Sequence, residues 1–172
     1  MSKLETLNDL FMEELRDLYH AEQQLLKSLP EMEEAAHSAE LKIAFNEHRL
    51  QTEIHVQRLE TIFELLNVPA KGKTCKAMKG LLAEAKEHIK EKAASAVKDA
   101  SIIAAAQRVE HYEIAGYGTA RTFAATLGYT QAEDLLQQTL NEEGAADHRL
   151  THLAQGLNLE AMVAADGFQE RG

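Results

Sequence analysis

The scarcity of helix-breaking residues is the feature that most limits what this chain can fold into. Only two prolines, Pro30 and Pro69, occur among 172 residues. Proline is the residue least compatible with a helix interior, whereas Leu, Ala, Glu, Gln and Lys, which dominate the sequence, all favour helix. We therefore predict an all-α protein of long helices, with enough apolar residues for a hydrophobic core.

The few breakers and turn residues divide the chain into four long helices, with one short helix between the second and the third. The expected helices cover about residues 2 to the low thirties, 38–67, 75–92, 97–127 and 130–157. Pro30 should disturb the last turns of the first helix. The segment NVPAKGKT is the clearest loop.

Small polar residues before these helices are candidate N-caps, because a side-chain oxygen there accepts a hydrogen bond from a free backbone N–H. The candidates are Ser38, Thr74 and Thr130, while Gly128 should close the third long helix. Residues 1–158 are accordingly expected to form one bundle domain. Residues 159–172 are expected to form a C-terminal tail that docks partly or frays.

Charge and cysteine content exclude several classes of function. The formal net charge of −10 argues against nonspecific binding to nucleic acid or to an anionic membrane. Cys75 is the only cysteine, so an intramolecular disulfide is impossible and a reducing cytoplasm fits best. The acidic, amphipathic N-terminal segment is unlike a signal peptide, and no uncharged run approaches the roughly 18 residues of a membrane span.

Each long helix carries an apolar stripe with steps of three and four residues, and each stripe is interrupted by polar residues near its middle. The interrupting residues are Glu22 in the first helix, His48, Thr52 and His55 in the second, Glu110 and Glu113 in the third, and Glu143 and Asp147 in the fourth. A stripe of this kind normally faces the core, so these polar side chains are predicted to point inward.

The interruptions also fall at matching heights if consecutive long helices form antiparallel hairpins. With a turn near Ala36, Glu22 lies fourteen residues before the turn, level with the segment between His48 and Thr52. With a turn near residue 129, Glu113 lies sixteen residues before it, level with the segment between Glu143 and Asp147. One polar layer is therefore expected to cross the bundle at mid-height.

A layer of five buried acids requires compensating positive charge, because one unpaired buried carboxylate costs several kcal/mol. The inward stripes contain neither Lys nor Arg at this level. Two divalent metal ions would supply about four positive charges, and carboxylate oxygens with imidazole suit Fe or Mn. Such a layer is found in ferritin-like di-metal bundles.

At VEHYEIAGYG, DLYHAEQQL and LNEEGAADHRLTHLA the chain resembles the YciE/YciF-type ferritin-like stress proteins of bacteria, over nearly its whole length. The resemblance implies an antiparallel ferritin-like four-helix bundle with a long crossover, a di-metal site and a homodimer, but no defined reaction. The metal ligands it implies are Glu22, His48, Glu110, Glu113, Glu143 and Asp147.

The second helix departs from the family pattern, in which a His is followed three residues later by Glu and then by Thr. This chain has His48, Gln51 and Thr52 at these positions. Glutamine is neutral and a weak metal ligand, so one of the two metal positions is in question. Gln51, Thr52, His55 and Tyr117 are therefore kept as additional ligands or supporting residues, with His55 as a substitute ligand.

Three functions remain open from the sequence. The first is a di-iron or di-manganese protein that acts on O2 or peroxide, and the second is a noncatalytic metal-binding or structural stress protein. The third is an adaptor whose helices bind a partner. At the level of single residues, the alternatives are that His48 and His55 are ordinary core histidines, and that the paired acids face solvent, as Glu142 is expected to do.

Overall fold

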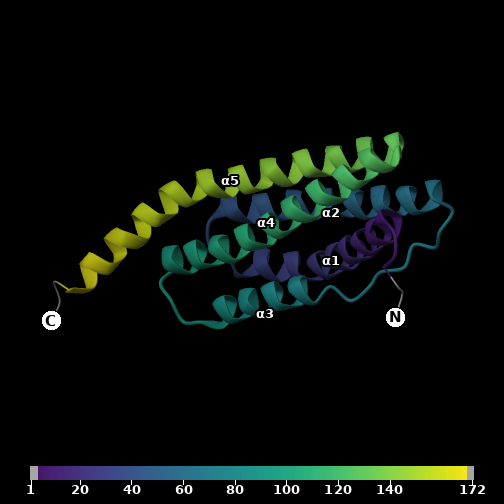
Figure 1. Cartoon of the computed structure of the whole chain (residues 1–172). Helices are drawn as coiled ribbons and strands as arrows, with labels where there is room; N and C mark the ends of the chain where they lie inside the picture. The colour runs from purple at the N-terminus through teal and green to yellow at the C-terminus, as the bar shows by residue number, and fades with distance from the viewer. Residues whose placement is uncertain (1–3, 170–172) are drawn as a thin grey trace.

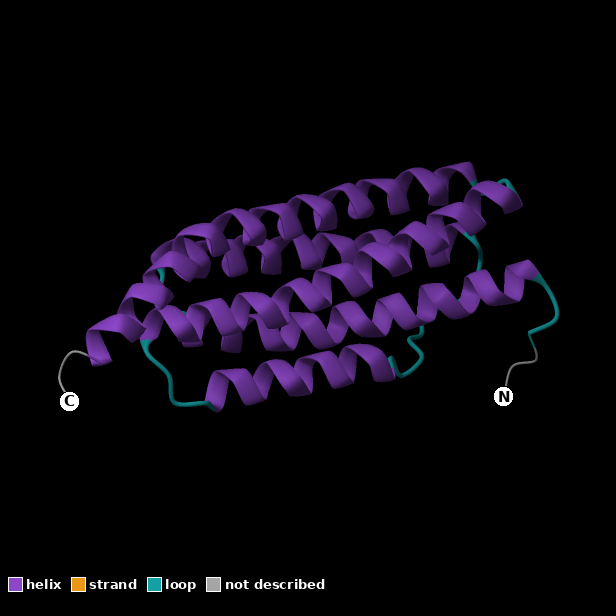
Figure 2. Cartoon of the chain, turned by 60° about the vertical axis from the view of Figure 1, so that its left-hand side comes forward, coloured by secondary structure: helices purple, strands orange, loops and turns teal. Residues whose placement is uncertain are grey.

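The computed structural model describes residues 4–169, with side chains described up to residue 163, and this part contains helices and no strand. Figure 1 shows an elongated bundle, and Figure 2 shows it turned by 60°. The helices are α1 (Leu7–Ala35), α2 (Ala39–Leu65), α3 (Lys76–Lys90), α4 (Ser95–Leu127) and α5 (Thr130–Gln169). The prediction of an all-α protein with four long helices and one short helix is confirmed.

The four long helices pack as two antiparallel hairpins. A short turn joins α1 to α2, and a turn at residues 128–129 joins α4 to α5. Across the bundle, α1 packs on α4 and α2 packs on α5. The connection from α2 to α4 runs back along the bundle and contains α3, which lies against α1 and α4, so α2 and α4 run in the same direction (Figures 1 and 2).

The start of α1 differs from the prediction that the helix begins near residue 2. Thr6 and Asp9 form a capping box, in which the Asp9 N–H donates to Thr6 Oγ1 at 3.1 Å and the Thr6 N–H donates to the Asp9 carboxylate at 2.9 Å. These bonds fix the first turn at Leu7. Pro30 does not end the helix, since α1 continues to Ala35 while Leu29 and Met32 pack in the core.

The caps of the other helices are partly as predicted. Ser38 caps α2, and Gly128 closes α4 with φ of 79°. Thr74 does not cap α3: that position belongs to Cys75, whose Sγ accepts from the Met78 N–H at 3.3 Å. Thr130 is already the first helical residue of α5, and α4 begins at Ser95, slightly before the predicted start.

The prediction that the last helix ends near residue 157 is wrong. Helix α5 continues to Gln169, and its end extends past the other helices in Figure 1 (yellow). Leu, Glu, Ala and Met, which favour helix, make up six of the eight residues 158–165, and the segment after Leu157 has no proline. Helix formation therefore runs through the boundary expected between bundle and tail.

Two apolar clusters form the core, one on each side of a polar layer. One contains Leu29, Phe45, Val109 and Leu150 among others, and the second contains Leu15, Leu59, Tyr117 and Leu136 among others. On α2, α4 and α5 the sequence positions between these two sets include the predicted polar interruptions, and on α1 Glu22 lies at their boundary, directly after Ala21. The core is thus divided at mid-height, as the stripes predict.

No helix of the described residues has the length and apolar character that crossing a membrane requires.

Candidate metal centre

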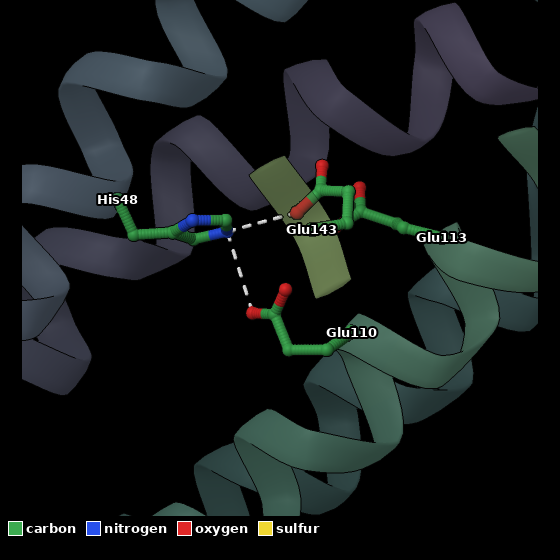
Figure 3. Close-up of side chains that lie close together, drawn as sticks. All are labelled: His48, Glu110, Glu113 and Glu143. Atoms are coloured by element: carbon green, nitrogen blue, oxygen red, sulfur yellow. Dashed lines mark ion pairs between the residues drawn. The ribbon is translucent and has the colours of Figure 1, made fainter. Parts of the chain in front are cut away.

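Six polar side chains from the four long helices meet in the layer that divides the core. They are Glu22 from α1, His48 and His55 from α2, Glu110 and Glu113 from α4, and Glu143 from α5, and all six are buried. Figure 3 shows four of them, with the His48 ring facing Glu110 and Glu143. The spacing along each helix explains the convergence, because residues three, four or seven positions apart share one helix face.

Two overlapping groups within this cluster have the geometry of metal sites. Ligand atoms of His48, Glu110, Glu113 and Glu143 lie within 4.8 Å of one another, as do those of Glu22, His55 and Glu143. In the first group, His48 Nε2 lies 3.3 Å from Glu110 Oε1 and 3.7 Å from Glu143 Oε2.

In the second group, His55 Nδ1 lies 2.9 Å from Glu143 Oε1 and 3.4 Å from Glu22 Oε1. Glu143 belongs to both groups, with one oxygen towards each histidine. Glu113 belongs to the first group alone.

The polar atoms of this cluster lack partners to a degree that is unusual in a folded core. Nine buried side-chain N and O atoms in the described residues have no hydrogen-bond partner, and all nine belong to these six side chains. Leaving a buried polar atom unsatisfied costs about 1–3 kcal/mol. Carboxylate oxygens and imidazole nitrogens that converge in a buried layer with few hydrogen bonds are what a cation requires, so the residues present fit a metal ion.

The charges of the cluster fit two divalent ions. Glu22, Glu110, Glu113 and Glu143 carry four negative charges when ionised, and two divalent cations supply four positive charges, with both histidines neutral. In the described part of the chain these carboxylates form ion pairs only with His48 and His55. Without a metal, the cluster must therefore hold protons instead.

Burial without a metal changes the protonation of these groups. It raises the pKa of Glu110 and of Glu143 to about 8, and in both cases the negative charge of Glu22 contributes in the same direction. Burial and the charges of Glu22 and Glu143 raise the pKa of Glu113 well above its usual range. Burial lowers the pKa of His55, but Glu143 and Glu22 outweigh it and raise the value to about 10.

A second carboxylate, Glu142, contacts His55 on the side of the ring opposite Glu143, and the sequence did not predict this contact. His55 Nε2 lies 2.9 Å from Glu142 Oε2, and Arg58 Nη2 donates to Glu142 Oε1 at 2.9 Å. The Arg58 guanidinium lowers the pKa of Glu142. The expectation that Glu142 is only an exposed neighbour is therefore wrong. The sequence feature that could have indicated this contact is Arg58, because it follows His55 by three residues and therefore lies near it on the face of α2 that packs on α5.

The remaining predicted residues surround the cluster in different ways. Tyr117 is fully buried, and its hydroxyl donates to Glu22 Oε1. The Thr52 hydroxyl donates to the His48 carbonyl at 2.9 Å, so it does not face the carboxylates as a donor. Gln51 is half-buried and lines a cavity beside His48 and Glu110.

Asp147 is the predicted ligand that the structure does not bring into either group. It accepts a hydrogen bond from Gln107 Nε2 at 3.2 Å and lies 3.5 Å from His111 Nε2, at the edge between α4 and α5. One turn beyond Glu143, it is rotated by about 40° around the helix axis. This rotation moves it from the centre of the bundle to the edge.

Comparisons with known proteins agree on one family and one fold. The family described as "Domain of unknown function (DUF892)" matches residues 6–162. Protein YciF of Escherichia coli is 43% identical over 152 residues, covering 88% of this chain and 92% of YciF. The crystal structure of that stress protein matches with a TM-score of 0.87 and 42% identity, covering 90% of this chain and 98% of the other.

Two further solved structures extend this comparison. YcfI of Rhodopseudomonas palustris, provisionally described as a structural protein, has a TM-score of 0.85 and 42% identity, with coverage of 87% of this chain and 95% of the other. A protein from Xanthomonas campestris has a TM-score of 0.73 at 17% identity, covering 93% of this chain and 98% of the other. The last similarity concerns the fold alone.

Proposed function

We propose that this chain, which belongs to the DUF892 family, is a ferritin-like stress-response protein whose buried cluster binds one or two Fe or Mn ions. The observation that carries the proposal is the set of nine unpartnered N and O atoms, all in one cluster of four carboxylates and two imidazoles. The role in stress follows the Escherichia coli relative, which is described as a stress protein. The arrangement of two hairpins with a long crossover between them supports the ferritin-like assignment.

Each of the six residues of the cluster has a defined task in this proposal. His48, Glu110 and Glu113 would hold one ion, Glu22 and His55 would hold the second, and Glu143 belongs to both groups. Bound Fe or Mn would supply redox chemistry towards O2 or peroxide. Tyr117 orients Glu22 through its hydroxyl, Glu142 orients His55, and the two apolar clusters exclude water above and below the layer.

A noncatalytic role is the second candidate, and one observation favours it. Gln51 stands beside His48 where the family pattern has a glutamate, so the first group lacks one anionic ligand. A centre that holds a single ion without turnover would serve as a structural element. The Rhodopseudomonas relative is provisionally described as a structural protein. The number of bound ions separates the two candidates.

The remaining proposals concern assembly and location. We propose a cytoplasmic homodimer that pairs through the outer face of α2, where Ile43, Leu50 and Ile54 are 52%, 47% and 45% exposed. Their spacing of seven and four residues places them on one helix face, as in helix–helix interfaces. Light scattering after size exclusion should give twice the chain mass for the wild type and the single-chain mass for Leu50→Glu; a wild type of single-chain mass at all concentrations would contradict the dimer.

Metal content tests the proposed centre directly. The wild type, expressed with added iron and manganese, should contain close to two ions per chain by elemental mass spectrometry, whereas the double variant Glu113→Ala with Glu143→Ala should contain none. The matched control is Glu53→Ala with Glu64→Ala on exposed positions of α2. One ion per chain would support the noncatalytic candidate, and absence of metal in the wild type would overturn both.

A further inference from the structure

A cavity between α2 and α5 ends at the proposed metal centre. Its volume is about 170 Å³, and its walls come from α2, α4 and α5. His48 and Glu110, two members of the cluster, form part of its lining, and Gln51 and Arg149 line it as well. The side chain of Arg149 is 43% exposed, so this end of the cavity reaches the surface. The cavity therefore connects solvent with one end of the buried layer.

The exposure of the six cluster residues shows which end that is. Glu22, His55, Glu113 and Glu143 are 0% exposed, while His48 is 6% and Glu110 is 3% exposed. Only the two residues that line the cavity have measurable contact with solvent among these six. A small molecule that approaches the cluster along this cavity meets the first group before the second.

Short side chains create the space at this level. Ala44 on α2 and Ala145 and Ala146 on α5 line the cavity, and Gly144 precedes them in the sequence. These three alanines, at the height of the cluster, leave a gap between the helices. Phe45 and Leu150 complete apolar walls. An apolar cavity of about 150 Å³ binds xenon or benzene, so the volume here is sufficient for a small ligand.

Charges at the two ends determine which ligands suit the cavity. Arg149 forms an ion pair with Glu47 at the mouth, so its guanidinium is already neutralised. The inner end presents the Glu110 carboxylate beside the His48 imidazole. An anion would meet a carboxylate inside and, among the residues that line the cavity, no unpaired cation outside, and a large organic molecule exceeds the volume. Small uncharged molecules match both the walls and the ends.

We propose that this cavity is the binding pocket through which small neutral molecules of the size of O2 or H2O2 reach the centre at His48 and Glu110. This inference rests on the proposed function, because a route to the cluster has meaning only if the cluster binds metal. The inference adds the side of the bundle from which a ligand enters, the class of ligand, and the alanines that determine whether the ligand can pass.

The first test detects the pocket without any metal. Crystals of the metal-free protein under xenon pressure should show xenon between Ala44, Ala146 and Leu150. Ala146→Leu fills the cavity from α5 and should remove the xenon, and Ala44→Leu fills it from α2 if the first variant does not fold. Ala125→Leu is the matched control, because Ala125 is an exposed helical position on α4 that does not line the cavity.

The second test measures passage to the centre. Nitric oxide is a neutral diatomic molecule that binds Fe(II), and stopped-flow absorbance gives its binding rate in the protein loaded with iron. In Ala146→Leu this rate should fall by at least about tenfold, while its iron content remains that of the wild type. In the control Ala125→Leu both the rate and the iron content should remain those of the wild type. An unchanged rate in Ala146→Leu with the cavity filled would overturn the route.

The two tests fail in distinguishable ways. Absence of xenon in the wild type overturns the pocket, whatever the metal content. Xenon in the pocket together with absence of bound iron and manganese overturns the proposed function and, with it, the role of the cavity as a route to metal. Xenon in the wild type, its loss in Ala146→Leu and slower nitric oxide binding in that variant together support the proposal.

Discussion

His55 Nε2 lies 2.9 Å from Glu142 Oε2, while His55 Nδ1 on the other side of the ring lies 2.9 Å from Glu143 Oε1. A carboxylate that accepts from Nε2 keeps the proton on that nitrogen and leaves the lone pair of Nδ1 directed at the cluster. Arg58 holds the same carboxylate in place with two hydrogen bonds. Glu142 is thus a positioning residue for His55.

We predict that Glu142→Gln weakens metal binding without removing it, because the amide no longer fixes the tautomer of His55. Loss of such a supporting contact typically reduces metal affinity by about 10–100-fold. Isothermal titration with Co2+ on the metal-free protein measures the change, and Glu160→Gln on an exposed turn of α5 provides the control. Equal affinity in Glu142→Gln and the wild type would show that His55 is held by other contacts or is not a ligand.

The stability of the metal-free protein should fall as pH rises. Glu110 and Glu143 have pKa values raised from 4.5 to about 8 in the folded state, so they favour folding fully below pH 4.5, and this contribution is lost as pH rises through 8. The His55 pKa, raised from 6.5 to about 10, acts in the same direction between those values. Urea midpoints of the metal-free protein should therefore be lower at pH 8.5 than at pH 5.5.

Metal should reverse this trend, because it binds the deprotonated carboxylates and stabilises the folded state by mass action. The midpoint of the loaded protein should rise between pH 5.5 and pH 8.5. Glu110→Gln should flatten the pH dependence of the metal-free protein, whereas the exposed change Glu160→Gln should leave it intact. A metal-free midpoint that rises with pH would contradict the buried, protonated cluster.

Tyr117→Phe should destabilise the protein, because the Tyr117 hydroxyl donates to Glu22 in a fully buried position. Losing a hydrogen bond to a charged group costs about 1.5–3 kcal/mol. Tyr129→Phe is the matched control: its hydroxyl donates to Asn8 Oδ1 at 2.9 Å in a half-buried setting, so the loss there should be about 1 kcal/mol. Chemical unfolding of the metal-free proteins at pH 6 measures the loss in free energy of unfolding for each variant. Equal losses would show that the hydrogen bond to Glu22 is no stronger than an ordinary uncharged one.

The sequence predicts the fold and the polar layer for the same reason. Breakers are rare, so helix periodicity persists over long segments, and a stripe such as that from Leu15 through Glu22 to Leu29 identifies both the core and its interruption. Helix ends are less accessible, because Cys75 and Thr6 cap through bonds that several neighbouring residues could equally make. Asp147 shows the limit of periodicity: a rotation of about 40° separates the core from its edge.

Contacts that depend on two helices at once could not be predicted from either stripe. The Arg58–Glu142–His55 chain joins α2 and α5 at flanking positions, where exposure in one helix is decided by the neighbour. The cavity beside His48 likewise requires the alanines of α5 to face Ala44 on α2. Such features follow from the relative rotation of packed helices, which a single helical pattern leaves open.

Gln51→Glu should increase the number or affinity of bound ions. Gln51 lines the cavity with His48 and Glu110, so a carboxylate there would add an anionic oxygen ligand beside the first group. If the wild type holds one ion per chain, the variant should hold close to two ions per chain. If the wild type already holds two, the more weakly bound ion should bind more tightly in the variant. Gln57→Glu, an exposed change on the same helix, should alter neither the number nor the affinity of bound ions.

The added negative charge of Gln51→Glu should also lower the stability of that variant without metal at pH 8.5. Elemental mass spectrometry and Co2+ titration measure the occupancy. Unchanged occupancy and affinity in Gln51→Glu would place this side chain outside the reach of the metal.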